Sequence, residues 1–580
     1  MPPLTVEANQ KKSKPKSAAM KKAPVAAPAA PAPVASTAPA AESAATEASE
    51  VPYNTPAGVS VITSEDLGTY GNNDLDDALR SQPGTFTRIS PQNPGLAVNI
   101  RGFEGSGRVN TNIDGVRQNF RFTGHEAQGF AYVDPALVAG IEIERGAVST
   151  AGGAGALAGA ANLRTLDVQD ILRPGQTAGG LTSVTWGSNN QGFSEMAAGA
   201  VTNGSVGIAG AISKREPNAY ENGDGITVPL TFQDLESGLF KVNFQLDEEQ
   251  SLRFGGVFYN NDFFANSYFQ NVASNTFTVK YAYKPIANDL IDFRLNGYRN
   301  EVTMKYGTDA TPNAGNPPKG SAWGRVIDDE GWGFDVTNVS RFHLGTVAVK
   351  SEYGYEYFRD DVDSYNRFQP ASLGGVNPSG VSSIGGTFSE TTFSQGIFDF
   401  IAGLRYDTFE LKGSGTTVNP FPLMPIPGPY TVDRSDGAFS PKLTLSAKPF
   451  DWFQPYVTYS QSFRAPTISE TLAGGSHPGG ASATFQPNPF LEPESQEGWE
   501  FGFNTSYANA LVHNDTFHFK ADYYTMDVEN YIAACSSGGS RYFCNTPGTS
   551  NVQGVELQSM YDAGMVFAGA SYTYTHTDLP

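Results

Sequence analysis

Residues 517–524 read Phe517-His518-Phe519-Lys520-Ala521-Asp522-Tyr523-Tyr524. Successive side chains of an extended strand point to opposite faces, so the odd-numbered residues form an apolar face and the even-numbered residues a mainly polar one. The same alternation recurs in residues 291–296 and 442–447. Each segment therefore predicts a strand that lies between apolar and polar surroundings.

Segments of this kind follow one another from about residue 176 onward. Several exceed the usual soluble strand of about 5 to 6 residues, and tight turns alternate with long loops such as residues 308–323 and 369–387. Short turns at one end and long loops at the other are typical of an outer-membrane β-barrel. A large soluble sandwich and a β-helix are the alternatives, but a β-helix would show a short fixed repeat and we find none. The pattern favours an all-β transmembrane barrel with antiparallel strands.

The composition of the 580-residue chain agrees with this class of protein. The 26 Tyr, 38 Phe and 63 Gly are typical of strands and turns, and no uninterrupted apolar run approaches the roughly 18 residues of a spanning helix. The chain has 59 Asp and Glu against 38 Lys and Arg, a formal net charge of −21. Because phosphate binding needs clustered basic side chains, we expect no nucleic-acid partner.

The N-terminal part of the chain differs from the rest. Leu4-Thr5-Val6-Glu7-Ala8 is a short β-prone segment, and residues 9–50 are an Ala, Pro, Lys and Ser-rich linker that cannot bury enough apolar surface to become ordered. Residues 51–175 have a compact α+β pattern. We expect strands at Val59–Thr63, Val98–Arg101 and Ile141–Glu144, and a capped helix start within Asn73–Leu79.

The two ends of the sequence carry two further expectations. We count roughly seventeen strand candidates, whereas bacterial single-chain barrels close with an even number, so either the last hairpins are missing or the count is wrong. No signal peptide is visible, because Met1 leads directly into Pro2-Pro3-Leu4.

Cys535 and Cys544 lie close together in a Gly and Ser-rich stretch. This spacing suits a small loop disulfide in an oxidising compartment better than a metal site. Two unpaired thiols are the alternative.

The order of these parts resembles the TonB-dependent outer-membrane receptors. Residues 4–8 are similar to a TonB box, and four segments resemble the family's plug motifs in their family order: Gly58–Thr63, Ile100–Phe103, Ile113–Arg117 and Ile143–Gly146. The resemblance implies a TonB box at 1–8, a linker at 9–50, a plug at 51–175 and a barrel at 176–580 of the family's 22-stranded type, truncated at its C-terminus. It also implies a Gram-negative outer-membrane importer energised by the inner-membrane TonB complex.

The same resemblance implies ion pairs between plug and barrel wall. Arg101 and Arg145 lie in the plug motifs that face wall carboxylates in the family, and Glu494 and Glu500 occupy the matching wall positions. We expect these four residues to form a plug-to-wall network, bidentate where the geometry allows. Exposed surface charges are the alternative.

Within the family the chain resembles receptors for haem, especially haemophore receptors. That group has one histidine at the plug apex and another in a loop between an FRAP box and an NPNL box. Here these correspond to His125, to His477, and to the boxes Phe463-Arg464-Ala465-Pro466 and Asn488-Pro489-Phe490-Leu491, with Phe490 in place of the usual Asn. Ferric haem has two open axial positions that neutral imidazoles can fill, so the resemblance implies haem held between His125 and His477.

We therefore expect a receptor that takes haem from a carrier protein such as haemoglobin or a haemophore and imports it as a transported ligand. We find no catalytic motif and expect no enzyme and no catalytic cofactor. A ferric-siderophore importer and a passive channel or adhesin are the alternatives. His343, His513, His518 and His576 show no metal-ligand spacing and are expected to be structural or exposed.

Overall fold

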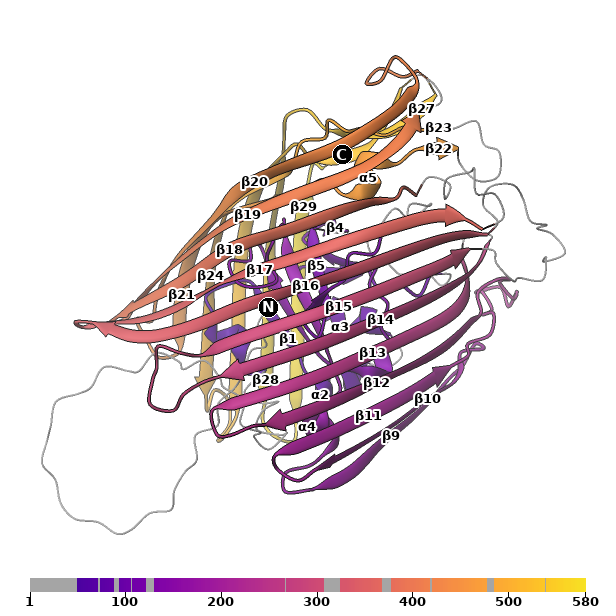
Figure 1. Cartoon of the computed structure of the whole chain (residues 1–580). Helices are drawn as coiled ribbons and strands as arrows, with labels where there is room; N and C mark the ends of the chain where they lie inside the picture. Colours follow the sequence, from indigo (N-terminus) through magenta and orange to yellow (C-terminus); the bar gives the residue numbers. More distant parts are fainter. Residues whose placement is uncertain are drawn as a thin grey trace, which may run out of the picture.

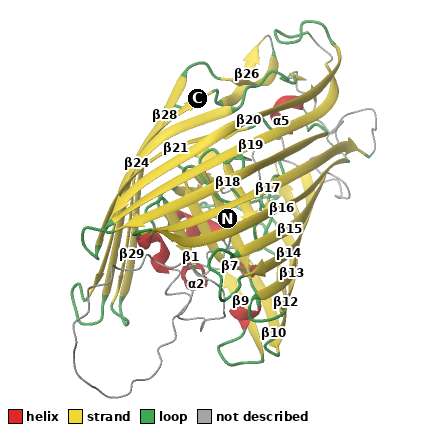
Figure 2. Ribbon diagram, turned by 60° about the vertical axis from the view of Figure 1, so that its left-hand side comes forward, coloured by secondary structure: helices red, strands yellow, loops and turns green. Residues whose placement is uncertain are grey.

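The structure is a computed structural model that describes residues 49–70, 74–87, 93–105, 107–121, 130–265, 268–306, 324–367, 377–417, 420–476, 484–537 and 539–579. It consists of a large antiparallel barrel, coloured purple through magenta to yellow in Figure 1, and a small α+β domain, the plug, coloured indigo to purple. In Figures 1 and 2 the elements of the plug lie inside the barrel. This is the architecture that the sequence predicts.

The plug is built on two small sheets. A five-stranded sheet has the order β1-β7-β8-β5-β6 with β5 and β8 parallel, and a three-stranded sheet has the order β2-β3-β4. The described elements of the plug are β1 (Val59–Ile62), α2 (Ser64–Tyr70), α3 (Leu75–Arg80), β2 (Thr85–Thr87), β3 (Val98–Ile100), β4 (Phe103–Glu104), β5 (Val109–Ile113), β6 (Val116–Arg117), η1 (Pro135–Leu137), β7 (Val138–Arg145), β8 (Gly159–Thr165) and α4 (Val168–Ile171). The three strands predicted in this region are confirmed as β1, β3 and β7.

The predicted helix start is also found. Helix α3 begins at Leu75, and the side chain of Asp74 accepts a hydrogen bond at 2.8 Å from the backbone N–H of Asp76. Such a cap satisfies one of the backbone donors that a helix leaves free in its first turn. The apolar residues of α3 and of the plug sheets pack into one core that also includes Tyr524 and Met526 of the barrel wall. The plug therefore shares its core with the barrel.

Within the described residues the barrel has seventeen strands in chain order, and the barrel order returns from β29 to β9. They are β9 (Ala178–Gly187), β10 (Gly192–Thr202), β11 (Val206–Arg215), β12 (Gln233–Gln245), β13 (Gln250–Ala265), β14 (Tyr268–Tyr283), β15 (Phe293–Tyr306), β16 (Arg325–Leu344), β17 (Val347–Asn366), β18 (Gly380–Gln395), β19 (Phe398–Thr417), β20 (Gly428–Ala447), β21 (Phe453–Arg464), β24 (Glu494–Ala508), β25 (Thr516–Glu529), β28 (Thr549–Asp562) and β29 (Phe567–Thr577). The count of about seventeen is confirmed, and the even number expected from closure is not found. Because neighbours from β9 to β29 are antiparallel, these two end strands run in the same direction.

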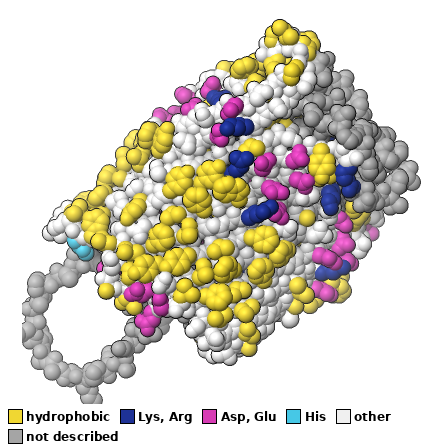
Figure 3. Space-filling model, in the orientation of Figure 1, with side chains coloured by type: hydrophobic (Ala, Val, Ile, Leu, Met, Phe, Trp, Pro, Cys, Tyr) yellow, Lys and Arg dark blue, Asp and Glu magenta, His cyan; other side chains and the backbone are white. Residues whose placement is uncertain are grey.

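The two faces of β25 follow the alternation of apolar and polar side chains in residues 517–524. His518, Lys520 and Asp522 are buried toward the plug, whereas Phe517 and Phe519 lie half-buried on the outer face. Figure 3 shows hydrophobic side chains spread over the outer face of the barrel, with charged side chains gathered toward one side of the view. None of the helices in the described ranges has the length and apolar composition needed to cross a membrane.

Strand β21 ends at Arg464 and β24 begins at Glu494 at one end of the barrel, which we call the loop end. There α5 (Ile468–Leu472) and a small sheet in the order β22-β23-β27-β26 lie beside the ends of β19 and β20 (Figure 1). The strands of this loop sheet are β22 (Gly475–Ser476), β23 (Thr484–Phe485), β26 (Ile532–Ser537) and β27 (Ser540–Asn545).

Candidate functional site

Arg101 and Arg145 join the plug to the barrel wall through buried carboxylates. Nε and Nη2 of Arg101 donate to the two carboxylate oxygens of Glu556 at 2.9 and 3.0 Å, and Nη1 donates to Glu500. Nε of Arg145 lies 3.1 Å from Oε2 of Glu556. Burying charges is costly unless they are paired and hydrogen-bonded, and the bidentate geometry of Arg101 on Glu556 provides both.

Two glycines make room for these carboxylates. Gly84 and Gly146 have φ of 67° and 84°, which glycine adopts without strain. A Cβ at Gly84 would collide with Glu556, and a Cβ at Gly146 would lie 2.7 Å from Oε1 of Glu500. The Arg145-Gly146 pair therefore supplies the cation together with the space that its network needs.

Glu494 belongs to a second network, nearer the loop end. Its carboxylate contacts Nη2 of Arg108 at 2.5 Å and Nε of Arg464 at 2.6 Å. Of the four residues predicted as one network, Arg101 and Glu500 therefore pair directly, Arg145 pairs with Glu556, and Glu494 binds a different plug arginine. The reason is position: Glu494 begins β24, whereas Glu500 lies six residues further along the same strand.

Helix α5 extends the second network. Nη1 and Nη2 of Arg464 donate to the two oxygens of Glu470 at 2.9 Å, and Nη1 of Arg121 in the plug lies 3.2 Å from Glu470. Burial alone would raise the pKa of Glu470, but the guanidinium groups of Arg464 and Arg121 outweigh that effect and hold the pKa below its ordinary value. Glu470 also completes a capping box with Thr467 at the start of α5. The loop after the FRAP box is thus fixed to the plug by charge.

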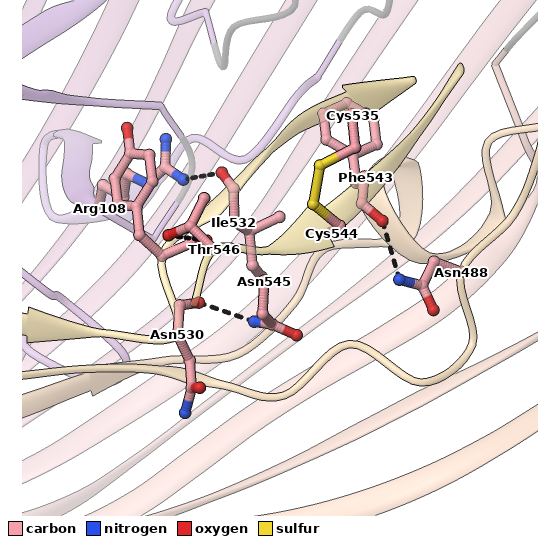
Figure 4. The surroundings of a disulfide bond; sticks show 10 residues. Arg108, Asn488, Asn530, Ile532, Cys535, Phe543, Cys544, Asn545 and Thr546 are labelled. Atoms are coloured by element: carbon pink, nitrogen blue, oxygen red, sulfur yellow. Dashed lines mark hydrogen bonds between the residues drawn. A yellow bond between two sulfur atoms is a disulfide. The ribbon is translucent and has the colours of Figure 1, made fainter. Parts of the chain in front are cut away.

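The two predicted boxes frame this loop. Phe463, the last but one residue of β21, lies in a buried apolar cluster, and Ala465-Pro466 lead from the end of the strand into α5. In the second box, Nδ2 of Asn488 donates to the carbonyl of Phe543 at 2.8 Å in the loop sheet (Figure 4). Pro489 follows, Leu491 is buried, and the side chain of Phe490, the residue that departs from the family pattern, is exposed.

The loop sheet carries the cysteines. Cys535 on β26 and Cys544 on β27 are joined in a disulfide (Figure 4). Figure 4 also shows Arg108 of the plug donating to the carbonyl of Ile532, a hydrogen bond of 2.6 Å at the base of β26. The backbone N–H of Ile532 in turn donates to Glu494 at 2.7 Å. The plug, the barrel wall and the loop sheet therefore meet at one carboxylate.

A cavity of about 740 Å³, including open space at its mouth, lies beside this network. Its plug side contains Arg117, Asn119 and Arg121. Its wall side joins apolar residues and carboxylates to the segment that follows the FRAP box: Asp329, Phe358, Asp360, Ile384, Phe409, Leu411 and Arg464–Ser469. The cavity is thus bounded by the plug apex, by the wall of β16 to β19 and by the start of α5.

The two histidines predicted to ligate haem lie outside the described residues. His125 falls between Arg121 and Phe130, and His477 directly follows Ser476. Leu4, Thr5, Val6, Glu7 and Ala8 of the predicted TonB box also lie outside them. Of the other histidines, His518 is buried and its ring stacks on Tyr53 at 5.0 Å, whereas His343, His513 and His576 are exposed.

Comparison with known proteins gives the family. The description "TonB-dependent Receptor Plug Domain" matches residues 51–160, and "TonB dependent receptor-like, beta-barrel" matches residues 218–580. This chain belongs to the TonB-dependent receptors. TonB-dependent receptors reside in the outer membrane of Gram-negative bacteria and are transporters, so the predicted location and the prediction that the chain is not an enzyme are confirmed.

Individual relatives are similar to this chain over most of its length. The chain is 28% identical over 510 residues to a "Hemin receptor" of Yersinia pestis, covering 83% of this chain and 69% of that protein. It is similar, with a TM-score of 0.82 and 29% identity, to the hemophore receptor HasR of Serratia marcescens solved with its hemophore HasA and heme, covering 91% and 82% of the two chains. The FrpB iron transporter of Neisseria meningitidis, at 17% identity and a TM-score of 0.70 over 90% of this chain and 79% of that chain, shows the same fold.

Several residues of this TonB-dependent receptor site were not identified from the sequence. Glu556, Arg108, Arg121 and Glu470 form ion pairs across the plug and wall, and Lys520 donates to the carbonyls of Pro52 and Thr55 at 2.9 and 3.0 Å and to that of Ala57. Only Glu470 had a local signal, because Thr467 three residues earlier makes a capping-box pattern. The others occupy inward positions on strands or loops whose partners depend on strand register.

Proposed function

We propose that this receptor binds haem from an extracellular carrier protein in the cavity between plug and α5 and imports it into the periplasm. The observation that carries the proposal is that the chain on each side of the cavity leads directly to a histidine. Arg121 lines the plug side four residues before His125, and α5 on the other side ends five residues before His477.

The chemistry of this arrangement suits haem. Four residues of chain span at most about 14 Å, so His125 is tethered to the cavity edge. Imidazole nitrogens from two sides would fill both axial positions of ferric haem, and the apolar wall of Phe358, Ile384 and Phe409 suits a porphyrin face. The hemin receptor and the haem-bound HasR among the relatives support the same ligand.

TonB supplies the energy in this proposal. Leu4–Ala8 would be the segment that TonB binds, and residues 9–50 would transmit the force from TonB to the plug. The haem carrier would contact the loop end, where α5 and the loop sheet lie. Haemoglobin and a haemophore are both carriers of the required kind.

A haem titration of the detergent-purified full-length receptor, followed by visible absorption, tests the proposal. The parent is expected to give a saturable low-spin spectrum, and His125→Ala and His477→Ala are each expected to give a weaker or high-spin form. His513→Ala, at an exposed position, is the matched control and should bind as the parent does.

No saturable haem spectrum in the parent would overturn the proposal and leave a ferric siderophore as the ligand to test next. Deleting Leu4–Ala8 should leave haem binding intact and abolish uptake by cells. Unchanged uptake after this deletion would instead favour a passive channel or adhesin.

A further inference from the structure

Arg117 occupies an unusual position among the plug arginines. It ends β6, is 8% exposed, and lines both the large cavity and a second space of about 370 Å³ between plug and wall. Its Nη1 donates to the carbonyl of Ala154 at 2.7 Å and its Nε donates to Oδ1 of Asn119 at 3.1 Å. The motif Ile113–Arg117 marked this position in the sequence, and the plug-to-wall networks make no use of it.

Arg117 differs in its partners from the other plug arginines that face the wall or α5. Arg101, Arg108, Arg121 and Arg145 each lie within ion-pair distance of a carboxylate. Within the described ranges, Arg117 makes no such pair, and its Nη2 has no hydrogen-bond partner. Burial lowers the pKa of Arg117 despite several carboxylates at longer range. A buried guanidinium with neutral partners and a free donor is costly to maintain unless an anion completes it.

Asn119 links Arg117 to one wall carboxylate, Asp360, through its side-chain amide. Its Oδ1 accepts from Arg117 while its Nδ2 donates to Oδ2 of Asp360 at 2.8 Å. The amide thus stands between the cation of the plug and the carboxylate of β17. Asp360 is satisfied through Asn119, and Arg117 is left facing the cavity.

The rest of the lining defines what kind of ligand fits. Phe358, Ile384 and Phe409 give the cavity an apolar side, and Asp329 on β16 lies there with Oδ1 unpaired. No group of three or more His, Cys, Asp or Glu in the part of the chain that the structure describes could hold a metal ion. An acidic wall repels a carboxylate, whereas Arg117 attracts one. A ligand with an apolar body and a carboxylate would therefore turn its carboxylate toward the plug.

We propose that Arg117 is the plug residue that binds a carboxylate of the transported ligand and so orients the ligand in the cavity. The inference rests on the proposed function, under which the carboxylate is a haem propionate. Arg117 and Asn119 then form an anion subsite separate from the two predicted iron ligands. The subsite orients the ligand rather than holding its iron.

The experiment compares ferric haem with its dimethyl ester, in which both propionates are neutral. Both are titrated into the full-length detergent-purified receptor and into Arg117→Met and Arg117→Lys. Arg80→Met, at a plug arginine whose side chain is 43% exposed and does not line the cavity, is the control. A charge-assisted hydrogen bond corresponds to roughly a tenfold or larger change in affinity. We expect the parent and Arg80→Met to bind haem about tenfold more tightly than the ester, Arg117→Met to bind both equally, and Arg117→Lys to keep part of the preference.

The ratio of the two affinities separates recognition from structure. If Arg117 only supports the loop at Ala154, Arg117→Met weakens haem and ester by the same factor, and the inference is wrong. Equal binding of haem and ester by the parent also contradicts it while leaving the haem proposal intact. Absence of saturable binding of either porphyrin by the parent contradicts the proposed function and this inference together.

Discussion

Glu494 of the barrel wall contacts Arg108 of the plug, with Oε1 2.5 Å from Nη2, and its side chain is fully buried. The same carboxylate accepts from Arg464 and from the backbone of Ile532. One side chain thus connects the plug, the segment leading to α5 and the loop sheet. Any movement of the plug that displaces Arg108 must break a contact at the base of the loop end.

Glu494→Gln tests how much this connection contributes to the stability of the folded protein. The change leaves two buried guanidinium groups without their shared counter-ion, and breaking a buried ion pair costs roughly 3–5 kcal/mol. We expect a clearly lower thermal unfolding midpoint for the detergent-purified protein at a fixed scan rate. Glu497→Gln, on the same strand but exposed on the outer face, is the control and should unfold with the parent. Equal midpoints for all three proteins would show that the network contributes little to stability.

Glu470 should make the stability of the loop end depend on acid. Its pKa lies below its ordinary value of 4.5 in the folded protein, because Arg464 and Arg121 outweigh the effect of burial. The ion pairs therefore stabilise the folded state fully above about pH 4.5, and this stabilisation is lost as the pH falls through the lowered pKa. Unfolding midpoints measured from pH 7 to pH 3 should show Glu470→Gln well below the parent at pH 7, with the gap narrowing below about pH 4.5. A difference in unfolding midpoint between parent and Glu470→Gln that stays constant over this range would contradict the assignment. Glu216→Gln, which changes an exposed carboxylate, is the control and should unfold at the same midpoint as the parent.

Lys520 holds the point where the chain enters the plug. Its Nζ donates to the carbonyls of Pro52, Thr55 and Ala57, and Nδ2 of Asn504 also donates to Thr55. Lys520→Met removes donors from buried carbonyls at a cost of roughly 1–3 kcal/mol each. We expect backbone hydrogen exchange over residues 49–63 to rise at least tenfold, with exchange in β24 and β28 unchanged. Lys214→Met, at an exposed position on β11, is the control and should leave the exchange of residues 49–63 as it is in the parent. If residues 49–63 of Lys520→Met exchange as slowly as those of the parent, Lys520 does not anchor this segment.

The strands were predictable because their signal is local. In β25 the alternation of Phe517 and Phe519 with His518 and Lys520 records which side faces the outside, and the structure follows it residue by residue. The plug strands β1, β3 and β7 and the cap of α3 were found for the same reason. The pairing of one polar residue with another is not encoded locally in the sequence. Glu556 lies 455 residues from Arg101, and nothing around Val555 or Leu557 distinguishes it from other inward carboxylates.

In the candidate site, too, the segments were predictable from the sequence and the contacts between them were not. The FRAP and NPNL boxes predict a loop between them, and helix α5 lies in that loop. Arg464 belongs to the first box, but its pairing with Glu494 requires β21 and β24 to be neighbours in one register. Arg117 lay within a recognised motif, yet its lack of a carboxylate partner is visible only once the wall around it is in place. The sequence therefore predicted the parts of the site better than their contacts.

The disulfide gives a last prediction, on the loop sheet. Cys535 and Cys544 are nine residues apart, and closing a loop of this length stabilises the folded state by roughly 2–3 kcal/mol through the entropy of the unfolded chain. The double substitution of both cysteines by serine should raise hydrogen exchange in β26 and β27 by about thirtyfold or more while leaving β25 and β28 protected. Asn488 and Arg108 donate hydrogen bonds to the backbone of this sheet. Under the proposed function, the looser sheet should therefore weaken capture of a haem carrier more than it weakens binding of free haem. The parent treated with reductant should behave as the double variant does, and reductant should change nothing further in that variant. Unchanged exchange in β26 and β27 would mean that the hydrogen bonds of the sheet hold it without the covalent link.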